Sequence, residues 1–180
     1  MAVSDNPLKR LLRDFTFEFA HWLLGDEVQN VRPLNVSLPS AQDQDISADQ
    51  VFYVYIKSGP DAILHIEFQG KGSKRPMKWR LLDYMGRLAE SNYPKKGELR
   101  LCSYVFYIGE GVGSTDKGEY EIKCLDGTIS LAWRYGVKHL WKMTASELLA
   151  LGSTPIAVNL ITFILFYEKC VVNIMSKKKW

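Results

Sequence analysis

The sequence predicts one mixed α/β domain, in which a β-sheet is covered by helices on both faces. The first observation is the order of patterns along the chain: a helix, three strands, a second helix and a further strand. The second is that the helix between the third and fourth strands permits a right-handed crossover and a parallel strand pair. The third is the composition: 180 residues, 47% hydrophobic and 24% charged, are typical of a globular chain that can bury a core.

The first helix is predicted to begin near Pro7 and to end at Gly25. Asp5 or Asn6 can cap its first turn, and proline is well tolerated there. Glycine is a common helix stop. Apolar residues recur every three or four positions and predict one buried face: Leu8, Leu11, Leu12, Phe15, Phe19, Trp22 and Leu23.

Three strands are predicted next. Val31–Leu38 contains Pro33, which cannot donate a ladder hydrogen bond, so this strand belongs at an edge. Gln50–Ile56 is apolar on both faces and rich in β-formers, which is typical of a strand covered on two sides. Ala62–Gln69 follows the turn signal around Ser58–Pro60.

The strand Ala62–Gln69 presents one apolar face and one face that becomes polar towards its end. Side chains alternate along a strand. One face therefore carries Ala62, Leu64, Ile66 and Phe68, and the other carries Ile63, His65, Glu67 and Gln69. This pattern predicts a strand whose far end opens into a cleft. His65 is interpreted first as a core histidine.

A basic, glycine-containing connection follows, at residues 70–78. Helical periodicity then predicts a helix over Pro76–Glu90, and Leu99–Ile108 is a further β-prone run.

The C-terminal part predicts an added hairpin and a last helix. Asp126-Gly127 is typical of a type I′ turn between the alternating arms of Glu119–Trp133. Val137–Lys142 is a short strand, and Thr144 with Glu147 has the spacing of a capping box before Leu148, Leu149 and Leu151.

The loop of the first hairpin decides which residues share a face. With a three-residue loop at Ser58–Pro60, Asp49 faces Gln69 and Val51 faces Glu67, so that Asp49, Glu67 and Gln69 converge. A two-residue or four-residue loop would instead put Asp49 on the opposite face. Three-residue loops are common, and a bulge near Asp49 would also change the outcome.

Converging oxygen groups here predict a metal site that acts on phosphate. Two carboxylates, Asp49 and Glu67, with the backbone carbonyl of Phe68 suit Mg²⁺, which prefers oxygen ligands. Such an ion polarises a phosphoryl oxygen and activates water, and Gln69 could orient that water. The adjoining cations can contact nucleic-acid phosphates without reading sequence: Lys71, Lys74, Arg75, Lys78 and Arg80.

These residues resemble the PD-(D/E)XK nuclease superfamily. The strand HIEFQ (residues 65–69), followed by M-x-x-RLLDY (residues 77–84), is more specifically similar to the Rpn-type recombination-promoting nucleases and putative transposases. Two further segments also resemble that family: LKRLLRDFTFEFAHWLLG (residues 8–25) and LWKMTASELLA (residues 140–150).

The resemblance implies a restriction-endonuclease-like core (αβββαβ) over residues 1–151. It also implies a Mg²⁺-dependent endonuclease that cuts double-stranded DNA in a recombination or mobile-element context. Mn²⁺ is an alternative ion. Asp49 and Glu67 would be the metal ligands, Gln69 would take the usual lysine position, and Arg80 and Tyr84 would face the site from the helix. Glu18 is the candidate for an acidic residue on the first helix. Residues 152–180 are expected to form a C-terminal tail, and its last part, residues 162–180, matches nothing in the family.

Charge and cysteine content set the expected environment. The net charge of +3 and pI near 8.7 are only mildly basic. Three cysteines without a CxxC pair predict buried free thiols in the cytoplasm. The most apolar run, Ile156–Tyr167, is too short and interrupted to span a membrane. A homodimer is a further expectation, because cutting both strands often requires two copies.

Two other functions remain open at this stage. The altered C-terminus favours a catalytically inactive nucleic-acid-binding or assembly module with the same fold. A non-nuclease α/β protein would be preferred if the Asp49 and Glu67 carboxylates lay far apart.

Overall fold

A computed structural model describes residues 7–34, 50–71, 75–92, 100–144 and 146–147. Its elements follow the predicted order: α1 (Pro7–Asp14), α2 (Thr16–Leu24), β1 (Val28–Pro33), β2 (Gln50–Ile56), β3 (Ala62–Gln69), α3 (Met77–Asn92), β4 (Arg100–Tyr107), β5 (Glu119–Lys123), β6 (Ile129–Arg134), β7 (Gly136–His139) and the 3₁₀ turn η1 (Leu140–Lys142).

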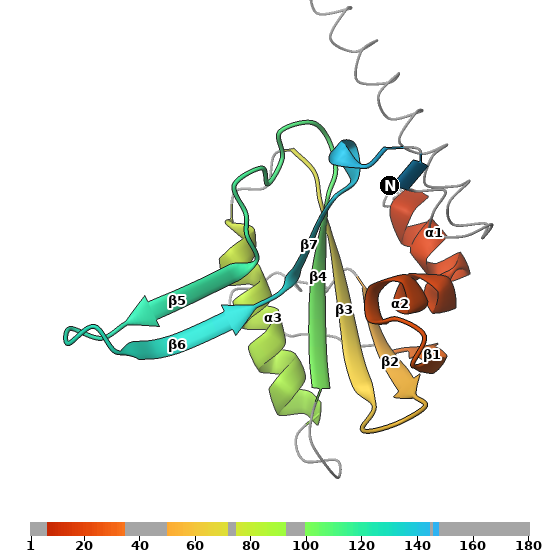
Figure 1. The fold of residues 1–180 in the computed structure, drawn as a ribbon, viewed down its shortest axis with the longest axis horizontal. Coiled ribbons are helices and arrows are strands. Elements are labelled where there is room, and N and C mark those ends of the chain that lie inside the picture. The colour runs from red at the N-terminus through yellow and green to blue at the C-terminus, as the bar shows by residue number, and fades with distance from the viewer. Residues whose placement is uncertain (1–6, 35–49, 72–74, 93–99, 145, 148–180) are drawn as a thin grey trace, which may run out of the picture.

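The main sheet has five strands in the order β1-β2-β3-β4-β7, and it is mixed. β1, β2 and β3 pair antiparallel, whereas β3–β4 and β4–β7 are parallel. Figure 1 shows α1 and α2 on one side of this sheet and α3 on the other, with the β5–β6 hairpin projecting away. The predicted mixed α/β class with helices on both faces is therefore confirmed.

Each face of the sheet has its own apolar core. On one face, Leu12 of α1 and Phe19 of α2 belong to the same buried cluster as three β3 side chains. These β3 residues, which were predicted to share that face, are Leu64, Ile66 and Phe68. On the other face, α3 contributes Leu88 to a cluster with Val51 and Ile63. The alternation predicted for Ala62–Gln69 is confirmed, because its odd-numbered residues face α3.

The predicted first helix is two helices, divided at Phe15. The hydroxyl of Thr16 donates hydrogen bonds to the carbonyl oxygens of Leu12 (2.9 Å) and Arg13 (3.0 Å). Such back-bonding by Thr bends helices, which accounts for the break. Gly25 ends α2 at φ 86°, as predicted.

The first β-strand begins and ends earlier than the predicted Val31–Leu38. β1 spans Val28–Pro33, and residues 35–38 lie outside the described part of the chain. It is an edge strand, as Pro33 indicated.

The register predicted for the β2–β3 hairpin is wrong, although odd-numbered residues of the two strands share a face, and Asp49 lies outside the described residues. Val51 pairs with His65, not with Glu67. The strands separate after the pair Val54–Ala62, because Asp61 accepts hydrogen bonds from the Ile56 N–H (3.0 Å) and the Tyr53 hydroxyl (2.9 Å). An odd number of residues still separates the paired positions, so odd-numbered residues of both strands share a face.

The β5–β6 hairpin forms as predicted, but its turn is not type I′. The Gly127 N–H donates to the Cys124 carbonyl (3.0 Å) and the Thr128 N–H donates to the Asp126 carboxylate (2.9 Å). The turn therefore begins at Cys124, so Asp126 and Gly127 are not its two central residues, and Gly127 has a φ of 84°. Cys124 is exposed on this projecting hairpin and Cys102 is half-buried, so these two thiols are free but not buried as expected, and Cys170 lies outside the described residues.

The C-terminal elements depart slightly from the prediction. The predicted strand Val137–Lys142 divides into β7 and η1. The capping box is confirmed: Thr144 N–H donates to Glu147 Oε2 (2.7 Å) and Glu147 N–H donates to Thr144 Oγ1 (3.2 Å). Leu148 onwards, including the 152–180 segment, lies outside the described residues. Within the described ranges, no helix is long and apolar enough to cross a membrane.

Gly118, which leads into β5, is a position where we expect only glycine to fit. Its φ is +71°, and an added Cβ would lie 2.2 Å from the Tyr135 carbonyl oxygen. Gly118→Ala should lower the free energy of unfolding by at least ~2 kcal/mol, because left-handed backbone alone costs roughly 1–2 kcal/mol. The control is Gly127→Ala, which has φ +84° but nothing within 4 Å of the added Cβ. Denaturant unfolding should show the larger loss for Gly118→Ala, and equal losses would contradict this assignment.

Candidate active site

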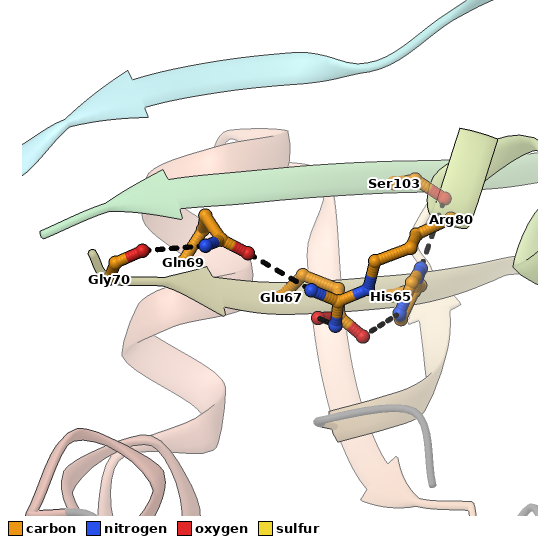
Figure 2. A network of polar contacts seen from close by, with 6 residues as sticks. All are labelled: His65, Glu67, Gln69, Gly70, Arg80 and Ser103. Atoms are coloured by element: carbon orange, nitrogen blue, oxygen red, sulfur yellow. Dashed lines mark hydrogen bonds and ion pairs between the residues drawn. The ribbon is translucent and has the colours of Figure 1, made fainter. Parts of the chain in front are cut away.

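The candidate site is a chain of polar contacts between the carboxyl half of β3 and helix α3. Figure 2 shows it running from Ser103 of β4 through His65 and Glu67 to Arg80 of α3 and then to Gln69. His65, Glu67 and Ser103 are buried, with 0%, 0% and 3% of their surface exposed. Buried polar groups are costly unless they are paired, so this network is a specific feature of the fold.

Glu67 is at the centre of the network. Its Oε2 lies 2.7 Å from Arg80 Nη2, and its Oε1 lies 3.5 Å from His65 Nε2. The carboxylate sits entirely within the protein, whereas the Arg80 side chain keeps 20% of its surface exposed. Arg80 therefore connects the buried charge with the protein surface.

Arg80 also contacts the last residue of β3. Its Nη1 donates to Gln69 Oε1 (2.9 Å), and Gln69 Nε2 donates to the Gly70 carbonyl (2.6 Å). Arg80 can bridge both residues because Glu67 and Gln69 are two apart on one strand and share a face. The guanidinium fork supplies parallel donors to the two acceptors.

His65 links Glu67 to the neighbouring strand. His65 Nδ1 lies 3.4 Å from Ser103 Oγ, and the His65 ring packs edge-on against Tyr84, with centroids 5.2 Å apart. The parallel register pairs His65 directly with Ser103. The interpretation of His65 as a buried histidine is right, but the structure adds that it touches Glu67.

Tyr84 lies one helical turn beyond Arg80, on the same face of α3. Its side chain is 1% exposed. The expectation that Arg80 and Tyr84 both face Glu67's side of the sheet is consistent with their contacts to Glu67 and His65. Any chemical role for Tyr84 stays a prediction.

The basic residues predicted to contact phosphate are only partly brought to the site. Lys71 is exposed just after β3. Arg75 lies 3.4 Å from Asp83 Oδ2, and the Lys78 ammonium lies over the Trp79 and Tyr120 rings. Lys74 lies outside the described residues.

Of the two other acidic residues predicted for the site, only Glu18 is in the described part of the chain, and it does not reach Glu67. Asp49 lies outside the described residues. Glu18 is on α2, which packs against the opposite face of the sheet from Glu67. No cluster of three or more His, Cys, Asp or Glu side chains suited to a metal occurs in residues 7–34, 50–71, 75–92, 100–144 and 146–147.

A second polar cluster, which sequence reasoning missed, surrounds Asp116. Its carboxylate accepts hydrogen bonds from the hydroxyls of Tyr107, Tyr120 (2.9 Å) and Tyr135 (2.9 Å), and from the Gly118 N–H (2.9 Å). Tyr107 is in β4, Tyr120 is in β5, and Tyr135 lies between β6 and β7. The cluster therefore ties the hairpin to the main sheet.

Alkaline pH should lower the free energy of unfolding through the tyrosines of this cluster. Burial, together with the hydrogen bond to Asp116, raises the pKa of Tyr107, of Tyr120 and of Tyr135. The folded state thus holds protons that the unfolded chain releases near pH ~10. This contribution to stability is complete below pH ~10 and is lost as the pH rises towards the folded-state values.

Denaturant midpoints measured between pH 8 and 11.5 test the prediction. We expect a falling midpoint above pH ~10 and a shallower fall in Tyr135→Phe, which has one fewer ionisable hydroxyl. The same slope in the variant and the wild type would contradict it.

Comparison of the chain with protein-family models, curated proteins and solved structures finds no match in any of the three. The fold and the site therefore have to be interpreted from their own geometry.

Proposed function

We propose that this protein is a metal-dependent DNA endonuclease with a restriction-endonuclease-like core. One observation carries the proposal: a fully buried glutamate, Glu67, lies near the carboxyl end of β3 and is held by Arg80 from the helix that crosses to the parallel strand β4. Open α/β sheets bind ligands outside the carboxyl ends of their parallel strands. Gln69, on the same face, extends the polar surface towards that end.

The donors on and beside β3 fit a hard cation. Glu67 and Asp49 would hold Mg²⁺ with the Phe68 carbonyl, and waters would complete the shell. A carboxylate has about four lone-pair sites and can hold a cation while it also accepts hydrogen bonds. When bound, the ion would supply polarisation of a phosphoryl oxygen and activation of water.

Chain connectivity supports Asp49 as the second carboxylate. Gln50 pairs with Ile66, the residue before Glu67. Asp49 is bonded to Gln50, and consecutive Cα atoms are about 3.8 Å apart. We therefore take Glu67, rather than Gln69, as the β3 residue that would share the ion with Asp49.

Arg80, Gln69 and Lys71 would act on the DNA backbone. Arg80 orients the carboxylate of Glu67 and the amide of Gln69 together, and its guanidinium would supply positive charge beside the DNA backbone. Lys71 is exposed at the end of β3 and can neutralise a phosphate. Double-stranded DNA is the proposed substrate, and a homodimer that cuts both strands is part of the proposal.

Supercoiled plasmid DNA tests this function directly. Purified protein with Mg²⁺ or Mn²⁺ should convert it to nicked or linear forms, and excess chelator should prevent this. Unchanged supercoiled DNA across a range of protein and metal concentrations would count against the proposal.

A second function, an inactive nucleic-acid-binding module, is favoured by the completeness of the Glu67 network. Both carboxylate oxygens already have a basic partner, Arg80 or His65. Such a module would bind DNA with strong salt dependence, would not cut it, and would gain no thermal stability from Mg²⁺. Cleavage with a metal-dependent rise in Tm would exclude it.

A further inference from the structure

Four aromatic rings form a continuous stack where α3 meets the β5–β6 hairpin. Trp79 of α3 packs on Trp133 of β6, Trp133 on Tyr120 of β5, and Tyr120 on Tyr135, with centroid separations of 5.5, 5.5 and 6.0 Å. The angles between successive ring planes are 35°, 26° and 24°. The rings of Trp133, Tyr120 and Tyr135 are therefore stacked, and the Trp79 ring is tilted against Trp133, whereas many aromatic pairs in proteins meet edge to face.

The stack is buried at one end and open at the other. Tyr135 is 8% exposed and Trp133 is 7% exposed, but Trp79 is 39% exposed. The buried end is fixed by the hydroxyl of Tyr135 on Asp116, and Trp133 Nε1 donates to the Lys78 carbonyl (3.2 Å). A rigid support therefore presents a large exposed indole to the surface.

Cations accompany the exposed ring. The Lys78 ammonium lies 5.2 Å from the Trp79 centroid and 5.1 Å from the Tyr120 centroid. Arg75, which is also exposed, donates from Nη2 to the Trp79 carbonyl (3.4 Å). An aromatic face bordered by positive charge is suited to a ligand that is itself aromatic and anionic, and a nucleotide has both properties.

We propose that Trp79 is a stacking platform for an unpaired nucleobase, and that single-stranded nucleic acid binds across α3 and the β5–β6 hairpin. The indole would stack on the base while Lys78 and Arg75 neutralise the neighbouring phosphates. Stacking on an aromatic side chain is tolerant of base identity, so the site would not read sequence. Trp79 directly precedes Arg80 in α3, so an unpaired stretch held there would lie beside the Glu67 network.

This inference adds a single-stranded element to the substrate of the proposed function. It rests on that function only for the choice of nucleic acid as ligand. Its test measures DNA binding and not DNA cleavage. The full chain, in chelator and without divalent metal, is titrated against a fluorescent dT15 strand and against a strand of the same length and charge with abasic sites throughout. Failure to cut DNA would leave this result unaffected.

The wild-type protein should bind dT15 more tightly than the abasic strand by about 5- to 150-fold, the ratio for one base stacked on an aromatic side chain. Trp79→Leu should abolish the preference and leave the affinity for the abasic strand unchanged. Phe17→Leu is the matched control, because Phe17 is an equally exposed aromatic (43%) on α2, on the other side of the sheet. It should keep the full preference.

Lys78→Gln separates charge from stacking, because it should weaken binding to both strands by a similar factor. Trp79→Phe covers the case in which Trp79→Leu fails to fold: it keeps a ring against Trp133 and should reduce the preference without abolishing it. Equal affinity of the wild type for the two strands, or a full preference in folded Trp79→Leu or Trp79→Phe, would overturn the proposal. Base-independent binding would identify the exposed stack as a packing or protein-contact surface.

Discussion

Glu67→Gln is expected to reduce metal-dependent plasmid cleavage by about 100- to 1,000-fold, the effect of removing one preorganised electrostatic group from an active site. The amide has nearly the shape of the carboxylate but carries no charge to hold Mg²⁺. Its oxygen can still accept a hydrogen bond from Arg80, so the fold should be retained. The measurement is the initial rate of supercoiled plasmid loss under saturating metal.

The control for this variant is Glu90→Gln, the same exchange at an exposed position of α3. It should cleave at the wild-type rate. Thermal unfolding of both variants shows whether a loss of rate reflects chemistry or misfolding. Folded Glu67→Gln with wild-type activity would remove Glu67 from the site.

Arg80→Met should have the largest effect on stability among the site variants, at about 3 kcal/mol. The substitution leaves the fully buried Glu67 carboxylate without its 2.7 Å guanidinium partner. Breaking a buried pair from one side costs roughly 3–5 kcal/mol, and the partial exposure of Arg80 favours the lower end of that range. Urea unfolding at neutral pH measures the loss.

Arg87→Met is the control for the loss of an α3 arginine. Arg87 Nε lies 2.8 Å from Asp83 Oδ1, but both side chains are partly exposed, at 27% and 26%. Its removal should cost less than about 1 kcal/mol. Glu67→Gln combined with Arg80→Met should restore part of the stability lost in Arg80→Met, because it removes the buried charge. Simple additivity of the two losses would contradict a direct Glu67–Arg80 coupling.

The parts of the site that lie on one regular element could be predicted from the sequence. The two-residue period of β3 was enough to put Glu67 and Gln69 on the face away from Phe68, and the helical period of α3 put Arg80 and Tyr84 one turn apart. Local backbone geometry fixes both relations. The parallel crossover also followed from the order of elements.

The pairing of strands could not be predicted where it depends on a particular side chain in the connecting loop. The β2–β3 register differs from the prediction because the carboxylate of Asp61 binds the Ile56 N–H and the Tyr53 hydroxyl. Nothing in the turn signal at Ser58–Pro60 indicates that Asp61 takes this role. The sharing of a face by odd-numbered residues of the two strands depends only on the odd spacing, and it is confirmed for the described residues, as in the pair Val51–His65.

Contacts between distant segments were missed for a different reason. Asp116 gathers tyrosines from positions 107, 120 and 135, and no periodicity relates a loop carboxylate to them. Ser103 carried a weak signal, because it is the one serine in the β-prone run of β4. Its pairing with His65 became visible only with the β3–β4 register.

Mn²⁺ binding to the intact chain, measured by electron paramagnetic resonance of the free ion, is the most direct test of the proposed metal site. We expect the wild type and Glu90→Gln to bind Mn²⁺ saturably, and Glu67→Gln and Asp49→Asn each to lose that binding while remaining folded. Identical binding curves for all four proteins, or no saturable binding by the wild type, would contradict a site shared by Asp49 and Glu67.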